Sequence, residues 1–171
     1  MMKQVQLFIV LLVLFLLQGT VFQVFSLRSF GYDLVASPYF ILIAVLMIGF
    51  FYSKTVALRY SIIFGFLIDF VYTDVWGVYA FCMTVTSYVL LFIGRHFNTH
   101  IIIILLTSMV ATILVDVEVY GIYTLIGITK QNFIEYIQQH LAPTLILNSV
   151  FTVICFYPLR ALCERLKEKL T

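Results

Sequence analysis

Long apolar segments alternate with short polar ones along almost the whole chain. The apolar segments cover approximately residues 5–25, 38–52, 56–72, 77–93, 101–125 and 141–157. A helix needs about 20 apolar residues to cross the hydrocarbon core of a membrane, and the six segments approach or exceed that length. The pattern therefore predicts an all-α polytopic membrane protein with six transmembrane helices in a single domain, residues 1–171.

One further segment, residues 129–139, has a helical pattern of a different kind. Its apolar residues Phe133, Ile134 and Ile137 fall on one face of a helix, opposite polar side chains. This arrangement is typical of a short helix that lies in the membrane interface rather than crossing it. We therefore predict an interfacial helix before the last span.

The last span is expected to end at Pro158, because proline lacks a backbone donor and disrupts the interior of a helix. The residues that follow, 160–171, are rich in charge and alternate with apolar positions. They are predicted to form a separate amphipathic tail helix in the cytoplasm.

Composition removes several other classes of protein. Hydrophobic residues make up 63% of the chain and charged residues 11%, with a mean hydropathy of +1.10. A soluble domain has about a quarter of its residues charged, so this chain lacks the polar surface that water requires. Its net charge of +2 is too small to indicate a nucleic-acid partner, which leaves the lipid bilayer as its surroundings.

The distribution of lysine and arginine predicts the orientation of the chain. Cytoplasmic loops of membrane proteins carry an excess of these residues. With six spans and an internal N-terminus, only Arg28 and Lys130 fall outside. The other eight fall inside: Lys3, Lys54, Arg59, Arg95, Arg160, Arg165, Lys167 and Lys169. We predict a multi-pass membrane protein with both termini in the cytoplasm.

Three polar residues within the predicted spans fall at a similar depth. With a rise of about 1.5 Å per residue, Asp69 lies about 18 Å from the inner end of its span and Asp116 about 22 Å along its own. Asn148 lies about 10 Å below the outer end of the last span. The three converge on the outer third of the membrane, either around a polar pocket that receives a ligand or partner, or in hydrogen bonds to neighbouring helices or water.

Other chemistry-bearing residues give no catalytic or metal-binding pattern. Glu118 lies about 200° around the helix from Asp116, so the two are expected to face different surroundings. His96 and His100 fall in a polar loop without a carboxylate or thiol nearby. The three cysteines have no metal-ligand spacing, and no nucleophile, zinc or phosphate-binding motif occurs. We expect no catalytic residue, no metal and no cofactor.

The segment GFLIDFVYTDVWGVYAFCMTVTSYV carries the most specific pattern in the chain. Gly65 and Asp69 are four apart, Gly77 follows after eight residues, and Ala80 and Tyr88 come next. This pattern resembles the rod shape-determining protein MreD family. The final helix, LAPTLILNSVFTVICFYPL, is similar to the last helix of the same family at four positions: Pro143, Asn148, Tyr157 and Pro158.

The resemblance implies a role in bacterial cell-wall elongation without a reaction of its own. Proteins of the family bind the membrane-anchored scaffold MreC and belong to a complex with the actin-like MreB, the RodA glycosyltransferase and a penicillin-binding transpeptidase. The resemblance also implies a fold like that of the substrate-binding subunits of energy-coupling-factor transporters. The motif residues, together with Asp116, are then candidates for partner binding or for structural polar contacts.

The main alternative is a vitamin-binding subunit of such a transporter. Those subunits usually carry alanine-rich docking motifs on the first helix, and residues 1–35 contain no alanine. A membrane enzyme that handles lipid precursors would need convergent acids and phosphate-binding cations, and the outer polar level has few cations.

Overall fold

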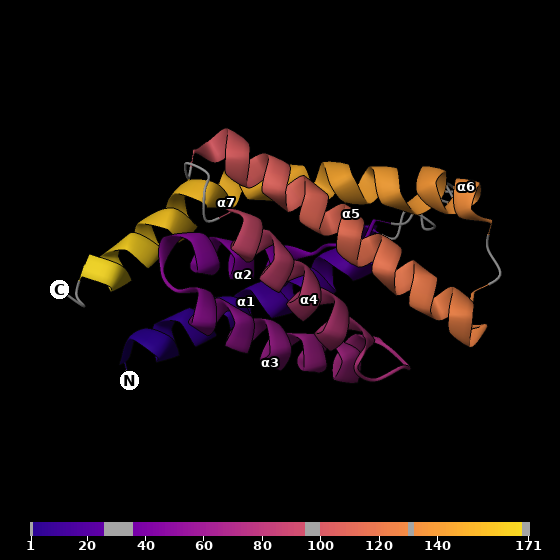
Figure 1. The fold of residues 1–171 in the computed structure, drawn as a ribbon, viewed down its shortest axis with the longest axis horizontal. Coiled ribbons are helices and arrows are strands. Elements are labelled where there is room, and N and C mark those ends of the chain that lie inside the picture. Colours follow the sequence, from indigo (N-terminus) through magenta and orange to yellow (C-terminus); the bar gives the residue numbers. More distant parts are fainter. Residues whose placement is uncertain (1, 26–35, 95–99, 130–131, 169–171) are drawn as a thin grey trace.

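A computed structural model describes residues 2–25, 36–94, 100–129 and 132–168. Within these residues the chain is entirely helical. The helices are α1 (Met2–Phe25), α2 (Phe40–Phe51), α3 (Lys54–Tyr72), α4 (Val78–Ile93), α5 (Ile101–Ile126), α6 (Phe133–Tyr136) and α7 (Ala142–Glu168), with a π-helical turn, Ile137–Leu141, between the last two. The six long helices run alternately in opposite directions between the two ends of one bundle (Figure 1).

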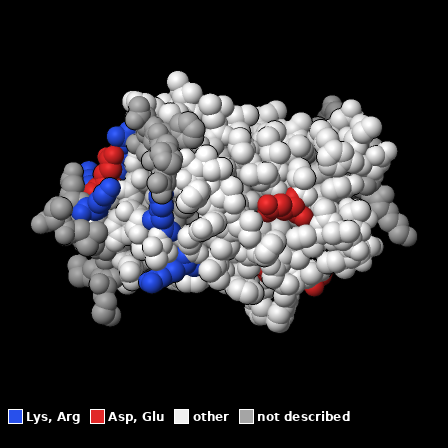
Figure 2. Space-filling model, viewed as in Figure 1, with Lys and Arg blue, Asp and Glu red and all other residues white. Residues whose placement is uncertain are grey.

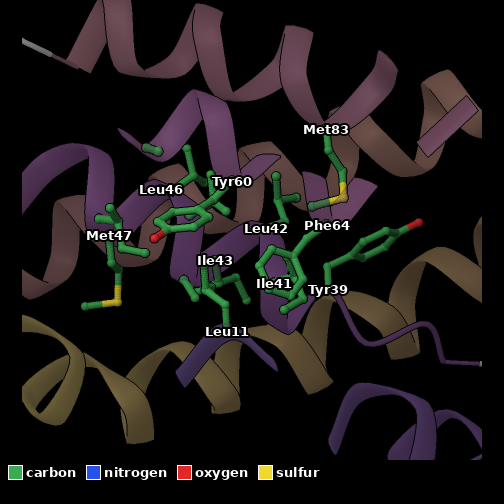
Figure 3. Close-up of a cluster of buried hydrophobic side chains, with 14 of the residues drawn as sticks. Leu11, Tyr39, Ile41, Leu42, Ile43, Leu46, Met47, Tyr60, Phe64 and Met83 are labelled. Carbon is green, nitrogen blue, oxygen red and sulfur yellow. The ribbon is translucent and has the colours of Figure 1, made fainter. Parts of the chain in front are cut away.

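Helix α2 forms the centre of the bundle because it is apolar on every side. All of its residues except Phe50 are buried, and a helix that is hydrophobic all round has to be enclosed by others. It contacts α1, α3, α4, α5 and α7. Figure 3 shows its side chains Ile41, Leu42 and Leu46 packed among residues of the surrounding helices.

Four segments are long and apolar enough to cross a membrane: Gln4–Val21, Lys54–Tyr72, Ile101–Ile126 and Ile137–Lys167. The remaining two predicted spans are the shorter helices α2, with 12 residues, and α4, with 16. Their lengths are about 18 Å and about 24 Å, less than the hydrocarbon core of about 30 Å. Both short helices therefore begin or end below a membrane surface if the bundle crosses the bilayer upright.

The outer surface of the bundle is apolar, as expected of a membrane protein. Large hydrophobic side chains such as Leu16, Phe66 and Ile154 are more than half exposed on α1, α3 and α7. The lysines and arginines visible in Figure 2 gather at the end that holds the beginning of α1 and the end of α7. Those described in the structure are Lys54, Arg59, Arg160, Arg165 and Lys167. The positions of Arg28, Arg95, Lys130 and Lys169 lie outside the described residues, so the orientation remains a prediction.

The C-terminal third differs from the sequence-based prediction. Pro158 does not end the last helix, because α7 continues through it to Glu168. Proline is tolerated in a membrane helix when neighbouring groups or local adjustments satisfy the backbone carbonyl that it leaves without a donor. The predicted tail is therefore an extension of α7 as far as residue 168.

The predicted interfacial helix, residues 129–139, is also not a separate element. Its only α-helical part is α6, and the π-helical turn joins α6 directly to α7. Lys130 and Gln131 lie outside the described residues. The other predicted boundaries lie within three residues of the observed helix ends, and that each of these helices crosses the membrane stays a prediction.

Gly65 allows α3 and α4 to approach closely. A Cβ atom at Gly65 would lie 2.5 Å from Cα of Ala80, a backbone atom that cannot rotate away. Small residues at helix crossings are common in membrane proteins, where packing rather than water exclusion drives association. The first part of the sequence motif is therefore a helix contact.

Gly65→Ala should separate α3 from α4 and lower stability by about 1–3 kcal/mol. Gly121→Ala is the matched control, because this α5 position meets no atom within 4 Å and alanine favours helix. Thermal unfolding in mild detergent measures the stability of both variants. Equal midpoints for the two variants would contradict the proposed close contact.

Candidate functional site

Asp69 binds the beginning of α4 from the neighbouring helix. Its carboxylate accepts hydrogen bonds from the backbone N–H groups of Gly77 at 3.0 Å, Tyr79 at 2.9 Å and Ala80 at 3.0 Å. These are among the donors that a helix N-terminus leaves without an internal partner, and the positive end of the helix dipole favours a carboxylate there. Asp69 is 1% exposed, so it is a structural anchor enclosed by α3 and α4.

Gly77 provides the backbone conformation that this contact needs. Its φ of 92° lies in the left-handed region, which a residue with a Cβ rarely adopts. No side chain at the Gly77 cap position binds the helix, so Asp69 takes over the capping role from eight residues upstream. Gly65, Asp69 and Gly77 thus form a single junction between α3 and α4.

The beginning of α2 is held in a similar way by more distant helices. Oδ1 of Asn148 on α7 accepts the N–H of Tyr39 at 2.7 Å, and Oε1 of Gln18 on α1 accepts that of Ile41 at 3.2 Å. Nδ2 of Asn148 donates to the carbonyls of Ser37 at 2.9 Å and Thr144 at 2.8 Å. One amide side chain therefore fixes the segment that enters α2 onto α7.

Asp116 is the centre of a second set of contacts beside the first. Its carboxylate accepts the hydroxyl of Tyr39 at 2.8 Å and contacts Nδ1 of His140 at 3.2 Å. The hydroxyl of Tyr136 donates to the Asp116 backbone carbonyl at 3.1 Å. These contacts link α5 to the entrance of α2 and to the π-helical turn before α7.

The series Asp116–His140–Ser37 has the order of a carboxylate, an imidazole and a hydroxyl. Nε2 of His140 lies 3.0 Å from Oγ of Ser37. A serine nucleophile also needs nearby donors for the developing oxyanion. The N–H of Ser37 binds Thr144, residue 38 is a proline without N–H, and the N–H of Tyr39 binds Asn148. The N–H groups of Ser37 and Tyr39 are thus already bound, and the series links α5, the π-helical turn and the segment before α2.

The structure brings together two of the three polar residues that were expected to converge. Tyr39 joins Asp116 and Asn148 directly, through its hydroxyl and its N–H. Asp69 lies in the adjoining junction, since Tyr79, whose N–H it binds, packs its ring 6.4 Å from that of Tyr39. All three are no more than 2% exposed and bound to neighbouring helices, which favours the second of the two alternatives stated above. Glu118 faces away from this group and binds Thr86, as its position on the helix predicted.

A small cavity lies next to the polar group at the same end of the bundle. It has a volume of about 70 Å³ and is lined by residues that include Gln18, Ser37, Tyr39, Tyr72 and Tyr79. None of Asp69, Asp116 and Asn148 lines it. The three polar residues therefore shape the walls around this cavity instead of facing into it.

The other predicted residues lie apart from the polar group. Tyr88 and Tyr157 are 58% and 69% exposed on the outer surfaces of α4 and α7. Pro143 occupies the first turn of α7, where a missing N–H is tolerated, and Pro158 lies on an exposed side of the same helix. No described group of His, Cys, Asp or Glu is arranged to hold a metal ion.

Several residues of the site escaped the sequence analysis, although one signal for them was present. His140, Thr144, Asn148 and Thr152 repeat every four residues, which places them on one face of α7. That polar stripe could have been read from the sequence. Tyr39 and Tyr136 could not, because aromatic residues are frequent in this chain and only the packing distinguishes these two.

The fold and the buried polar contacts define a helical membrane protein whose ionisable groups hold helix ends together. A family model described as rod shape-determining protein MreD matches residues 2–166, and the chain belongs to this family. The Rod shape-determining protein MreD of Bacillus subtilis (strain 168) is 29% identical over 166 residues, which cover 91% of this chain and 96% of the relative. No solved structure gives a significant match.

The family resemblance inferred from the Gly65–Asp69–Gly77 motif is thus confirmed. The family consists of proteins that determine cell shape and is not a known family of enzymes. The structure adds that the motif forms the junction between α3 and α4.

Asp69→Ala should leave the buried N–H of Ala80 and the half-buried N–H groups of Gly77 and Tyr79 without this acceptor, and lower stability by about 3 kcal/mol. The control is Asp74→Ala, which alters an exposed acid in the turn between the same helices. Thermal unfolding in detergent and the yield of folded protein report the difference. An Asp69 variant as stable as the Asp74 variant would show that the carboxylate does not anchor α4.

Proposed function

We propose that this protein is a non-enzymatic membrane component of the bacterial cell-wall elongation complex that binds MreC. Membership of the MreD family is the observation that carries the proposal. MreB, the RodA glycosyltransferase and a penicillin-binding transpeptidase are the further partners in the wider complex. The role is to position these partners in the membrane, so it requires stable surfaces rather than a reaction.

The buried polar group supports a positioning role. Asp69, Asp116 and Asn148 are engaged with backbone and side chains of four different helices, and this fixes where the entrances of α2 and α4 lie. A vitamin-binding subunit would instead need a ligand cavity of about 300–1,000 Å³. The cavity beside the polar group has a volume of about 70 Å³. The similarity to the substrate-binding subunits of energy-coupling-factor transporters stays a prediction, and it concerns only the fold.

We also propose that all six long helices cross the membrane, with both termini in the cytoplasm. The five described basic residues support this topology because they gather at the end of the bundle that holds the two termini. The end with Asp69 and Asp116 is then the outer end.

Depletion of the protein should convert rod-shaped cells to round ones, because the elongation complex would lose a partner. MreC should co-purify with the tagged chain in mild detergent. The control is a tagged membrane protein of similar size from another pathway. Cells that stay rod-shaped and a purified chain without MreC would reject the proposal.

Single cysteines test the topology in a chain without its native Cys82, Cys155 and Cys163. Asp74→Cys, in the turn between α3 and α4, should react with a membrane-impermeant maleimide in intact spheroplasts. Lys167→Cys should react only after the membrane is opened. The opposite labelling pattern would invert the proposed orientation. Labelling of both from outside would exclude an odd number of spans between them, and so would contradict the three spans α4, α5 and α7.

A further inference from the structure

Glu118 is an acid at membrane depth that the polar group around Asp116 does not use. It lies about 25 Å along α5 from Ile101 and about 12 Å before Ile126. Asp116, two residues earlier, is buried, whereas Glu118 is partly exposed at the outside of the bundle. An ionisable side chain that faces lipid raises the free energy of the folded protein and normally has a polar partner. We therefore expect Glu118 to have one.

Among the residues that the structure describes, the partners of Glu118 are neutral and come from α4. The hydroxyl of Thr86 donates to its Oε2 at 3.2 Å, and the thiol of Cys82 lies within hydrogen-bonding reach. A carboxylate can accept about four hydrogen bonds, and a thiol is a weak donor. The exposed part of the Glu118 carboxylate can therefore accept a hydrogen bond from a donor outside the bundle.

An apolar groove lies closer to the beginning of α5 than Glu118 does. It lies between α4 and α5, has a volume of about 260 Å³ and includes Ile93, Thr107 and Val110 in its lining. Thr107, Val110, Leu114 and Glu118 follow one another at three- or four-residue spacing, so they share one face of α5. We call the surface formed by Ile93, Thr107, Val110, Leu114 and Glu118 the α4–α5 face.

We propose that the α4–α5 face binds one transmembrane helix of a partner protein, which places a hydrogen-bond-donating side chain against Glu118. The proposal rests on the partner binding proposed above and names the surface and the chemistry of the contact. Interhelical hydrogen bonds and close packing against small residues such as Thr107 are the usual means of helix association in a membrane.

A second copy of this chain fits this surface less well than a different protein. Copies related by an axis along the membrane normal present each residue at the same depth in both molecules. Two copies joined through this surface would therefore bring their Glu118 carboxylates to one depth. Nearby acids of like charge repel each other, so a different protein that presents a donor fits Glu118 better.

Glu118→Leu should reduce the amount of MreC that co-purifies by about fivefold to thirtyfold, the effect of losing one such interhelical contact. Glu118→Gln keeps a hydrogen-bond acceptor, so the amount of co-purified MreC should fall less than with Glu118→Leu. Glu164→Leu, at the far end of α7, is the matched control and should behave like the wild type. The thermal midpoint of the Glu118→Leu chain should not fall, because leucine suits an apolar surface.

A photo-crosslinking residue at Val110 locates the contact directly. It should form an adduct with MreC, whereas the same residue at Val150, which is 53% exposed on α7, should form none. MreC that co-purifies equally with Glu118→Leu, or that crosslinks from Val150 and not from Val110, would overturn the inference while leaving the proposed function intact. Adducts from Val110 with a second copy alone would overturn the choice of partner. If MreC does not co-purify with the wild-type chain, both the proposed function and this inference are rejected.

Discussion

The arrangement of this protein follows from one constraint: within a membrane, backbone N–H groups at helix ends have no water to bind. Helices α2 and α4 are about 18 Å and about 24 Å long, too short to carry both ends to the membrane surfaces. Their first N–H groups are therefore enclosed by the bundle, and neither helix has a side-chain cap of its own. The neighbouring long helices supply the acceptors. Asn148 and Gln18 bind the beginning of α2, and Asp69 binds that of α4.

This constraint explains why polar residues gather at one depth in an otherwise apolar chain. Asp69 and Asn148 lie at the level where the short helices begin, and Asp116 holds Tyr39 at the same entrance. The glycines of the motif serve the same junction, because Gly65 lets α4 approach and Gly77 turns the chain into it. A motif that identifies the family is thus also the structural joint between two helices. The shape-determining role then requires rigid helix positions and a surface for partners, which Glu118 is placed to provide.

The apolar pattern was sufficient to predict the six long helices and their ends, except for the end of α7, because burial in lipid or in the core needs continuous hydrophobic segments. The depth calculation also placed Asp69, Asp116 and Asn148 near one level. It could not distinguish an open pocket from capped helix ends, since that depends on side-chain contacts between α2 and α7. The error at Pro158 has a physical cause: an exposed proline within a membrane helix need not end it. Tyr39 and Tyr136 were missed because their roles arise only when distant segments pack together.

Hydrogen–deuterium exchange in lipid nanodiscs tests the central claim most directly, because it reports whether the beginnings of α2 and α4 are bound and enclosed. The account predicts that the amides of Tyr39, Ile41, Gly77, Tyr79 and Ala80 exchange slowly, although each lies at or before the first turn of a helix. The amide of Asp74, in the exposed turn nearby, should exchange fast. Exchange of the five amides at the rate of Asp74 would contradict the account, because it would show that the polar side chains do not hold the short helices in place.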